Sequence, residues 1–319
     1  MNKVFSGLEQ LGFKEIDVEL YEKDIKKEIK KEATTNLYKS SLYEKKITCP
    51  VCDHTFKQLA LKSNAYRMVS KDSDFFIKYD LVNPYFYDVY ICESCGYSSL
   101  KVDFSKIGSK QKDLILKNIT PKFRPKIYPT EYTREIAIER YKLALLNSAY
   151  LNSKCSTKAM ICLKLAWMYR LGESNEDKEL ERNFLRFALE GFEEAFLNEM
   201  FPIYKMDKFL LMYLIGELNR RLLNYDEALS WFGRVLTTPK VGSTLKDLTR
   251  TQRDLIKEAQ IIKTKMEQNG EALEEQFNFD NKDDTLSKTT TSESKNKVPE
   301  KNTTKPNKSG FFKKILGAI

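Results

Sequence analysis

The 319-residue chain contains a single histidine, His54. Ser-His-Asp, Cys-His and multi-histidine metal catalysis each require a histidine that lies beside a chemical partner. His54 stands two residues after Cys52, where a metal knuckle is predicted below, and this leaves little room for any of these mechanisms. Because no other acid–base pair is specified by the sequence, we predict that the protein is not an enzyme.

Long apolar runs are also missing. The mean hydropathy is −0.51, and no stretch of about 18 apolar residues occurs, so no membrane-spanning helix is predicted. Residues 1–13 lack the apolar core and the cleavage site of a secretory signal. We therefore expect a cytoplasmic protein, in which paired cysteines indicate a metal site before a disulfide.

The net charge is +9, and the excess of basic residues is concentrated in one region. Residues 49–128 carry 13 basic and 8 acidic side chains, which is mild for a nucleic-acid-binding surface. Aromatic residues of the same region provide candidates for base stacking, although a small β domain also needs them for its core. These are Tyr66, Phe75, Phe76, Tyr85, Phe86 and Tyr87.

Two CxxC pairs, Cys49 with Cys52 and Cys92 with Cys95, give the strongest chemical signal. Each pair is a candidate zinc knuckle, and two knuckles supply the four sulfurs of a tetrahedral structural site. The gap between the knuckles exceeds the usual spacing of about 15–20 residues, but strands in the gap would bring them together. Four thiolates leave no coordination position for water, so we predict a structural zinc ion.

Other residues near these motifs have competing interpretations. His54 either replaces one cysteine as a ligand or, as we favour, lies outside the ligand set. Each CxxC pair is alternatively a redox dithiol, although such a motif normally stands alone at the start of a helix. Cys155 and Cys162 are two helical turns apart, and we interpret them as small buried hydrophobes rather than as a second site.

A polar group stands between the two knuckles. We interpret it as turn-forming residues with one arginine–aspartate pair, and an acidic active site is the alternative. The group consists of Arg67, Ser70, Asp72 and Asp74.

Changes in composition divide the chain into six segments. The fold class that they indicate is α+β, mostly α, with a small β zinc ribbon, a tetratricopeptide-like helical stack and a disordered C-terminal tail. The segments are a charged N-terminal arm (1–46), a zinc-ribbon-like domain (47–120), a proline-rich linker (121–130), a tetratricopeptide-like helical domain (131–268), a disordered tether (269–308) and a short amphipathic basic segment (309–319).

Local patterns also predict individual elements. β-branched and aromatic residues favour strands at 65–69, 75–82 and 85–92, and Ser105 is a possible N-cap for a helix over 105–118. Breaks at glycine, proline and asparagine separate the helices of the C-terminal half. These are expected near 131–150, 155–171, 177–198, 203–223, 225–237 and 245–268.

The helical region contains an internal repeat. Small and aromatic residues recur at i, i+4 and i+7, and Gly216 stands where two helices must approach closely. This pattern favours a tetratricopeptide-like right-handed stack, with a generic helical bundle as the alternative. The repeated sets are Ala137, Tyr141, Ala144; Ala188, Phe192, Ala195; and Ala228, Phe232, Val235.

The chain closes with an apolar, basic segment whose apolar side chains share one helical face. Contact with an anionic membrane surface is the favoured interpretation, which would place the protein at the inner face of the membrane. Docking into a groove of this chain or of a partner, and no role at all, are the alternatives. The residues concerned are Phe311, Phe312, Lys313, Lys314, Ile315 and Leu316.

Three stretches of the N-terminal half resemble the bacterial family of domain of unknown function 2225. They are LYEKKITCPVCDHTF, Arg67 followed by SKDSDF, and NPYFYDVYICESCGYSSL. The resemblance covers roughly residues 38–268 and implies an N-terminal metal ribbon followed by tetratricopeptide-like helices. It places the zinc ligands at Cys49, Cys52, Cys92 and Cys95. It further implies a bacterial cytoplasmic protein and brings no established activity.

Taken together, these patterns predict a non-catalytic zinc-binding scaffold or adaptor. The concave face of the helical stack would bind a protein or peptide, and the C-terminal segment would tether the molecule to a membrane surface. The alternative is a zinc-ribbon protein that binds nucleic acid through its basic residues.

Overall fold

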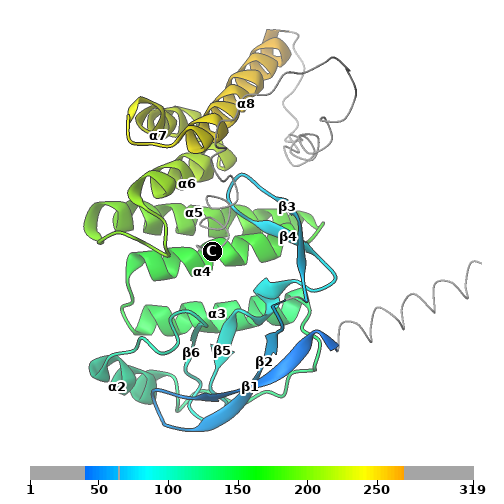
Figure 1. The fold of residues 1–319 in the computed structure, drawn as a ribbon, viewed down its shortest axis with the longest axis vertical. Coiled ribbons are helices and arrows are strands. Elements are labelled where there is room, and N and C mark those ends of the chain that lie inside the picture. The colour runs from blue at the N-terminus through cyan, green and yellow to red at the C-terminus, as the bar shows by residue number, and fades with distance from the viewer. Residues whose placement is uncertain (1–39, 64, 269–319) are drawn as a thin grey trace, which may run out of the picture.

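The computed structural model describes residues 40–63 and 65–268, which form three β-hairpins and a row of helices (Figure 1). The strands are β1 (Leu42–Thr48), β2 (Thr55–Leu61), β3 (Arg67–Lys71), β4 (Ile77–Asp80), β5 (Val89–Ile91) and β6 (Ser98–Leu100), with the 3-10 helix η3 (Pro84–Tyr87) before β5. The α-helices are α2 (Ser109–Asn118), α3 (Arg134–Tyr150), α4 (Cys155–Arg170), α5 (Asn175–Asn198), α6 (Lys208–Arg221), α7 (Tyr225–Thr237) and α8 (Ser243–Gln268). The predicted α+β, mostly α class is confirmed.

Within the described residues, each strand pairs with its neighbour in sequence, and all three pairs are antiparallel. The β1–β2 and β5–β6 hairpins have connections of equal length, since Thr48 pairs with Thr55 and Ile91 pairs with Ser98. Each of these connections contains one CxxC motif. The β3–β4 hairpin occupies the long stretch between the motifs and extends along the helices toward α6 (Figure 1).

Helices α3 to α8 pack against one another in chain order, so the body of the protein is a row of helical layers (Figure 1). The repeated small and aromatic residues are what these layers bury, because positions i, i+4 and i+7 share one face of a helix. The tetratricopeptide-like interpretation of the repeat stays a prediction. The buried sets are Ala137, Tyr141 and Ala144 of α3, Ala188, Phe192 and Ala195 of α5, and Ala228, Phe232 and Val235 of α7.

Gly216 in α6 is the point of closest approach to α7. A Cβ atom at this position would lie 2.7 Å from the ring of Phe232, which is fully buried. We expect Gly216→Ala to lower the free energy of unfolding by about 1–3 kcal/mol through overpacking. The matched control is Gly233→Ala in α7, where a Cβ would meet nothing within 4 Å.

The control should stabilise the chain by about 0.5–1 kcal/mol, because alanine restricts the unfolded chain more than glycine does. Urea denaturation followed by helical circular dichroism measures both changes. Equal effects of the two substitutions would contradict the close packing of α6 on α7.

Several element boundaries differ from the sequence predictions, each for a local reason. The strand predicted over 85–92 begins with η3, because the side chain of Asn83 accepts a hydrogen bond from the Tyr85 N–H and Pro84 fixes the first turn. Helix α6 begins at Lys208 rather than near 203, because Asp207 caps its N-terminus.

Two other observed boundaries also differ from the predicted ones. Helix α2 begins at Ser109 instead of near Ser105, with Gly108 as its N-cap. Strand β1 begins at Leu42, inside the segment 1–46 that was assigned to the charged arm. There the alternation of apolar and polar residues is weak, because β1 exposes most of its side chains.

The main hydrophobic core contains residues from both sides of the predicted linker at 121–130. Phe75 and Phe76, at the tip of the β3–β4 hairpin, are buried against Tyr213 of α6 and Trp167 of α4. A second core lies beneath the two CxxC connections and includes Phe56, Tyr97 and Phe104 among its buried residues. The β elements and the helices are thus packed together rather than separated by the linker.

Candidate metal centre

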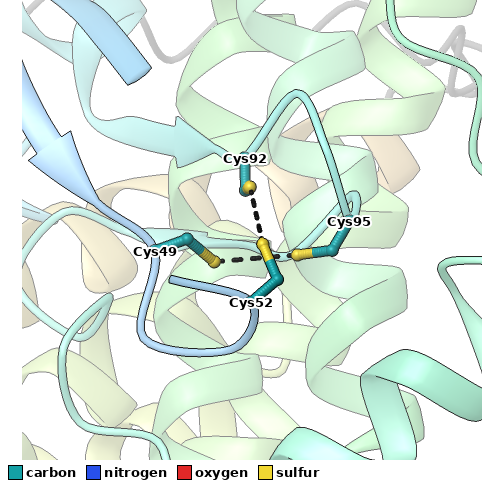
Figure 2. A group of neighbouring side chains, drawn as sticks. All are labelled: Cys49, Cys52, Cys92 and Cys95. Carbon is teal, nitrogen blue, oxygen red and sulfur yellow. Dashed lines mark hydrogen bonds between the residues drawn. The ribbon is translucent and has the colours of Figure 1, made fainter. Parts of the chain in front are cut away.

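Four cysteine side chains converge where the connections of the β1–β2 and β5–β6 hairpins meet (Figure 2). Their Sγ atoms all lie within 4.8 Å of one another, and Cys49–Cys95 and Cys52–Cys92 are both separated by 3.6 Å. Zinc–sulfur bonds of about 2.3 Å in a tetrahedron place the sulfurs about 3.8 Å apart. The structure therefore brings all four predicted residues into an arrangement that fits a metal ion.

The two connections form the same turn. In each, the N–H of the first cysteine donates to the carbonyl of the residue five positions later, at 2.9 Å in the first connection and 2.8 Å in the second. Asp53 and Gly96, which follow the second cysteine, both have left-handed backbones with φ of 56° and 76°. Glycine adopts this conformation at little cost, and aspartate tolerates it. Both turns direct their two sulfurs toward the same point (Figure 2).

The proximity of the thiols changes their acidity. Hydrogen bonds from Cys92 and Cys95 stabilise a thiolate at Cys49 and lower its pKa to about 4. The hydrogen bonds with Cys49 and Cys92 in turn oppose the loss of a proton from Cys95, whose pKa is raised. A divalent cation relieves this opposition because it attracts all four thiolates, so the cluster is chemically suited to a metal.

His54 lies beside the cluster and is not part of it. Its Nε2 is 3.2 Å from Oε1 of Glu93, a residue of the second CxxC connection, and its ring stacks on Phe56. The donor set is consequently four sulfurs without a histidine. His54 instead links the two connections across the outside of the site.

The helices hold the second connection in place. Asn147 of α3 is fully buried and accepts a hydrogen bond from the Ser98 N–H at 3.2 Å, while its Nδ2 donates to the Gly96 carbonyl at 3.4 Å. Thr120, just after α2, donates from its hydroxyl to the Cys95 carbonyl at 2.9 Å. Because these contacts fix the backbone around two of the cysteines, the geometry of the site depends on the helical part of the chain.

The polar group predicted between the knuckles separates into two places. Arg67 pairs with Asp80 across the β3–β4 hairpin, with Nη2 3.1 Å from Oδ2, in an exposed ion pair. Asp72 and Asp74 belong to the tip of the hairpin and both pair with Arg170 of α4, at 2.9 and 2.7 Å. The arginine–aspartate interaction was anticipated, but the buried partner comes from a distant helix.

These aspartates are part of a larger buried network. Ser73 donates from its hydroxyl to Glu217 of α6 at 2.6 Å, and Trp167 donates from Nε1 to Asp74 at 3.0 Å. We call this set the tip network, because it joins the tip of the β3–β4 hairpin to α4, α5 and α6. It consists of Asp72, Ser73, Asp74, Trp167, Arg170, Glu181, Glu217, Arg220 and Arg221.

The electrostatics of the tip network favour charged side chains in spite of burial. Burial alone would raise the pKa of the Asp74 carboxyl, but Arg170 and Arg221 more than offset it and hold that pKa well below its usual range. Burial would also raise the pKa of Glu217, but Arg220, Arg221 and the Ser73 hydroxyl together more than offset it and lower that pKa. Asp74 and Glu217 are therefore ionised at neutral pH, whereas burial raises the pKa of the Glu181 carboxyl.

Sequence reasoning did not identify the helical members of this network. Glu217 stands in the otherwise apolar stretch FLLMYLIGEL, and Arg170 follows the apolar stretch LAWMY. A charged residue inside an apolar helix is seldom fully buried unless it is paired. That signal would have pointed to a buried ion pair, although not to the hairpin as its partner.

The remaining candidate residues are mostly packed in the interior. Cys162 is buried, and burial raises the pKa of its thiol to about 12, while Cys155 is half-buried. The aromatic residues considered for base stacking are not available for it, with the exception of Tyr66 and the half-buried Phe86. Those that are buried are Phe75, Phe76, Tyr85 and Tyr87.

Some predictions concern residues outside the described part of the chain. These are the predicted arm up to residue 39, the tether (269–308) and the C-terminal segment with Phe311, Phe312, Lys313, Lys314, Ile315 and Leu316. Among the described residues, no helix combines the length and apolar character needed to cross a membrane.

Comparison with known proteins identifies the family. Residues 42–256, about two thirds of the chain, match the family described as "uncharacterized protein conserved in bacteria" (DUF2225). No curated protein and no solved structure matches the chain. The matched range begins with β1, ends in α8 and includes all four clustered cysteines. The chain therefore belongs to the bacterial family of domain of unknown function 2225.

Proposed function

We propose that the protein is a non-catalytic adaptor, in which a zinc-bound β module is fixed to a row of helices that binds a protein or peptide. The observation that carries this proposal is the tip network, because it joins the two parts through buried ion pairs between the β3–β4 hairpin and α4 and α6. A rigid molecule of this kind can present one surface in a fixed orientation to another.

The chemistry of the cysteine cluster supports a structural role for the metal. Four thiolates suit zinc, and a site with four protein ligands is closed to water and substrate. When bound, the ion would be held by Cys49, Cys52, Cys92 and Cys95 and would supply cross-linking of the two hairpins. Asn147 and Thr120 would maintain the backbone around the second pair.

Part of the helical surface is covered by the chain itself. The face of α4 and α6 that carries Trp167 and Tyr213 is covered by this chain's own Phe76 and Phe75. A partner must therefore contact other faces of the helical row. Exposed apolar side chains there provide contact points, and they include Phe187, Leu197, Met200, Leu223 and Ile261.

Site-specific photo-cross-linking in living cells tests the proposed function. A benzophenone amino acid is placed at Phe187 and Ile261 on the helices, and at Tyr43 and Val102 on the β module as matched exposed controls. We expect a discrete protein adduct from one or both helical positions and none from the controls. Adducts from the β module alone, or from no position, would contradict an adaptor that acts through its helices.

A further inference from the structure

An open groove lies on the helical row, and no residue of the β3–β4 hairpin lines it. It is formed by the end of α5, the start of α6 and the connection between α7 and α8, and has a volume of about 480 Å³. Its floor and walls are mostly apolar, with contributions from Phe196, Phe209, Met212 and Pro239. A groove of this composition takes an apolar side chain of a partner.

Two exposed apolar side chains follow Phe196 in the sequence. Leu197 and Met200, close in sequence to Phe196, expose 75% and 91% of their surface to solvent. Monomeric proteins rarely leave contiguous apolar side chains of this size uncovered without a binding role. The groove and these two residues together offer room for an anchor and for a second apolar contact.

The rim of the groove is positively charged. Lys208 and Lys240 both line it, and within the described part of the chain neither forms an ion pair with a carboxylate. The carboxylates that precede Lys208 most closely in the sequence already have hydrogen-bond partners. Asp207 accepts two N–H bonds at the start of α6, both at 2.9 Å, and Glu199 accepts the N–H and hydroxyl of Ser156.

We propose that this groove binds an acidic peptide with an apolar anchor, in which aspartate or glutamate flanks an aliphatic or aromatic side chain. The apolar anchor would enter between Phe196 and Phe209, and the flanking carboxylates would pair with Lys208 and Lys240. This inference rests on the proposed function and specifies the surface and the class of partner. The charge of the rim selects the sign of the partner's charge.

The same rim disfavours two other occupants. The C-terminal segment of this chain would bring Lys313 and Lys314 against Lys208 and Lys240, which is repulsive. A second copy related by a two-fold axis that passes through the groove would bring the like charges of the two rims together. An acidic partner in trans avoids both conflicts.

Selection from a random peptide library on the immobilised full-length chain tests the proposal. We expect the selected peptides to contain an apolar residue next to at least two aspartates or glutamates. The double variant Lys208→Glu/Lys240→Glu should weaken the binding of a selected peptide by about tenfold or more, measured by fluorescence polarisation. The matched control is Lys117→Glu/Lys122→Glu, which changes the net charge equally at exposed positions near α2.

A charge-swapped peptide gives a second readout that loss of folding cannot imitate. With lysines in place of its acidic residues, the peptide should bind the Lys208→Glu/Lys240→Glu variant better than it binds the unmodified chain. The proposal would be overturned if the selected peptides lacked acidic residues, or if a selected peptide bound both double variants with equal affinity. Self-association of the chain that closes the groove would also overturn it. A partner cross-linked at Phe187 or Ile261 would leave the adaptor function standing in that case.

Discussion

A Cys49→Ser/Cys92→Ser variant will lose its bound metal and the order of the two CxxC connections, while most of the helical row stays folded. The substitutions remove one sulfur from each of the two close pairs, Cys49–Cys95 and Cys52–Cys92. Structural zinc contributes about 10–16 kcal/mol in small zinc-finger peptides, which is more than the whole stability of many domains. The expected effect on the order of the two CxxC connections is therefore complete.

Two measurements monitor the loss of the metal and of the ordered structure. Native mass spectrometry should show one metal ion per chain for the unmodified protein and none for the variant. Hydrogen exchange should show lost protection in β1, β2 and the two CxxC connections. Protection should be retained in α4 to α7, whose core also contains Val89, Ile91 and Leu100 of β5 and β6. The hairpin tip around Asp74 should stay protected, because it is held by the helices.

Cys155→Ser is the matched control for the metal site. It removes a thiol that lies outside the cluster, so it should keep the metal and the protection of both hairpins. A double serine variant that still holds one metal ion would exclude the four-cysteine site. An unmodified protein without metal, yet with fully protected connections, would exclude a structural role for it.

An Arg170→Met variant should lose about 3–5 kcal/mol of unfolding free energy. Arg170 pairs with Asp72, Asp74 and Glu181 while only 5% of its side chain is exposed. Methionine keeps the apolar stem of the side chain but leaves these carboxylates buried close together without their shared cation. Removal of one partner from a buried ion network is strongly destabilising for this reason.

Arg67→Met is the matched control, because it removes an arginine–aspartate pair from the same hairpin at an exposed position. The pair with Asp80 has 84% of the arginine side chain in solvent, so its loss should cost less than about 1 kcal/mol. Urea denaturation measures both variants. Similar losses for Arg170→Met and Arg67→Met would contradict the buried network.

The cost of Arg170→Met should also shrink as the pH falls from 7 to 4. In the unmodified protein the pKa of Asp74 is held below its unfolded value of 3.8, so its contribution is present above that value and is lost as the pH falls toward the folded pKa. Without Arg170, burial raises the pKa of Asp74. Protonation of this carboxylate at mildly acidic pH then removes its unpaired negative charge. A cost that is constant between pH 7 and pH 4 would argue against ionised carboxylates in the network.

The sequence alone identified the fold class, the helical segments and the four cysteines. Periodic burial of residues such as Phe192 and Phe232 is a local pattern, since a helix places positions i, i+4 and i+7 on one face whatever it packs against. The CxxC spacing is similarly local, because a short turn directs both sulfurs of a pair to one side. These features could be predicted without knowledge of the neighbouring elements.

Only the tertiary structure decided which surfaces of the protein are covered and which remain open. Asp74 pairs with Arg170, 96 residues later in the chain, and Phe75 packs on Tyr213 of α6. Local secondary-structure propensity cannot predict such pairs, since they depend on which distant segments of the chain pack together. The same long-range packing places the hairpin tip on α4 and α6, and leaves the groove beside Phe209 exposed to solvent.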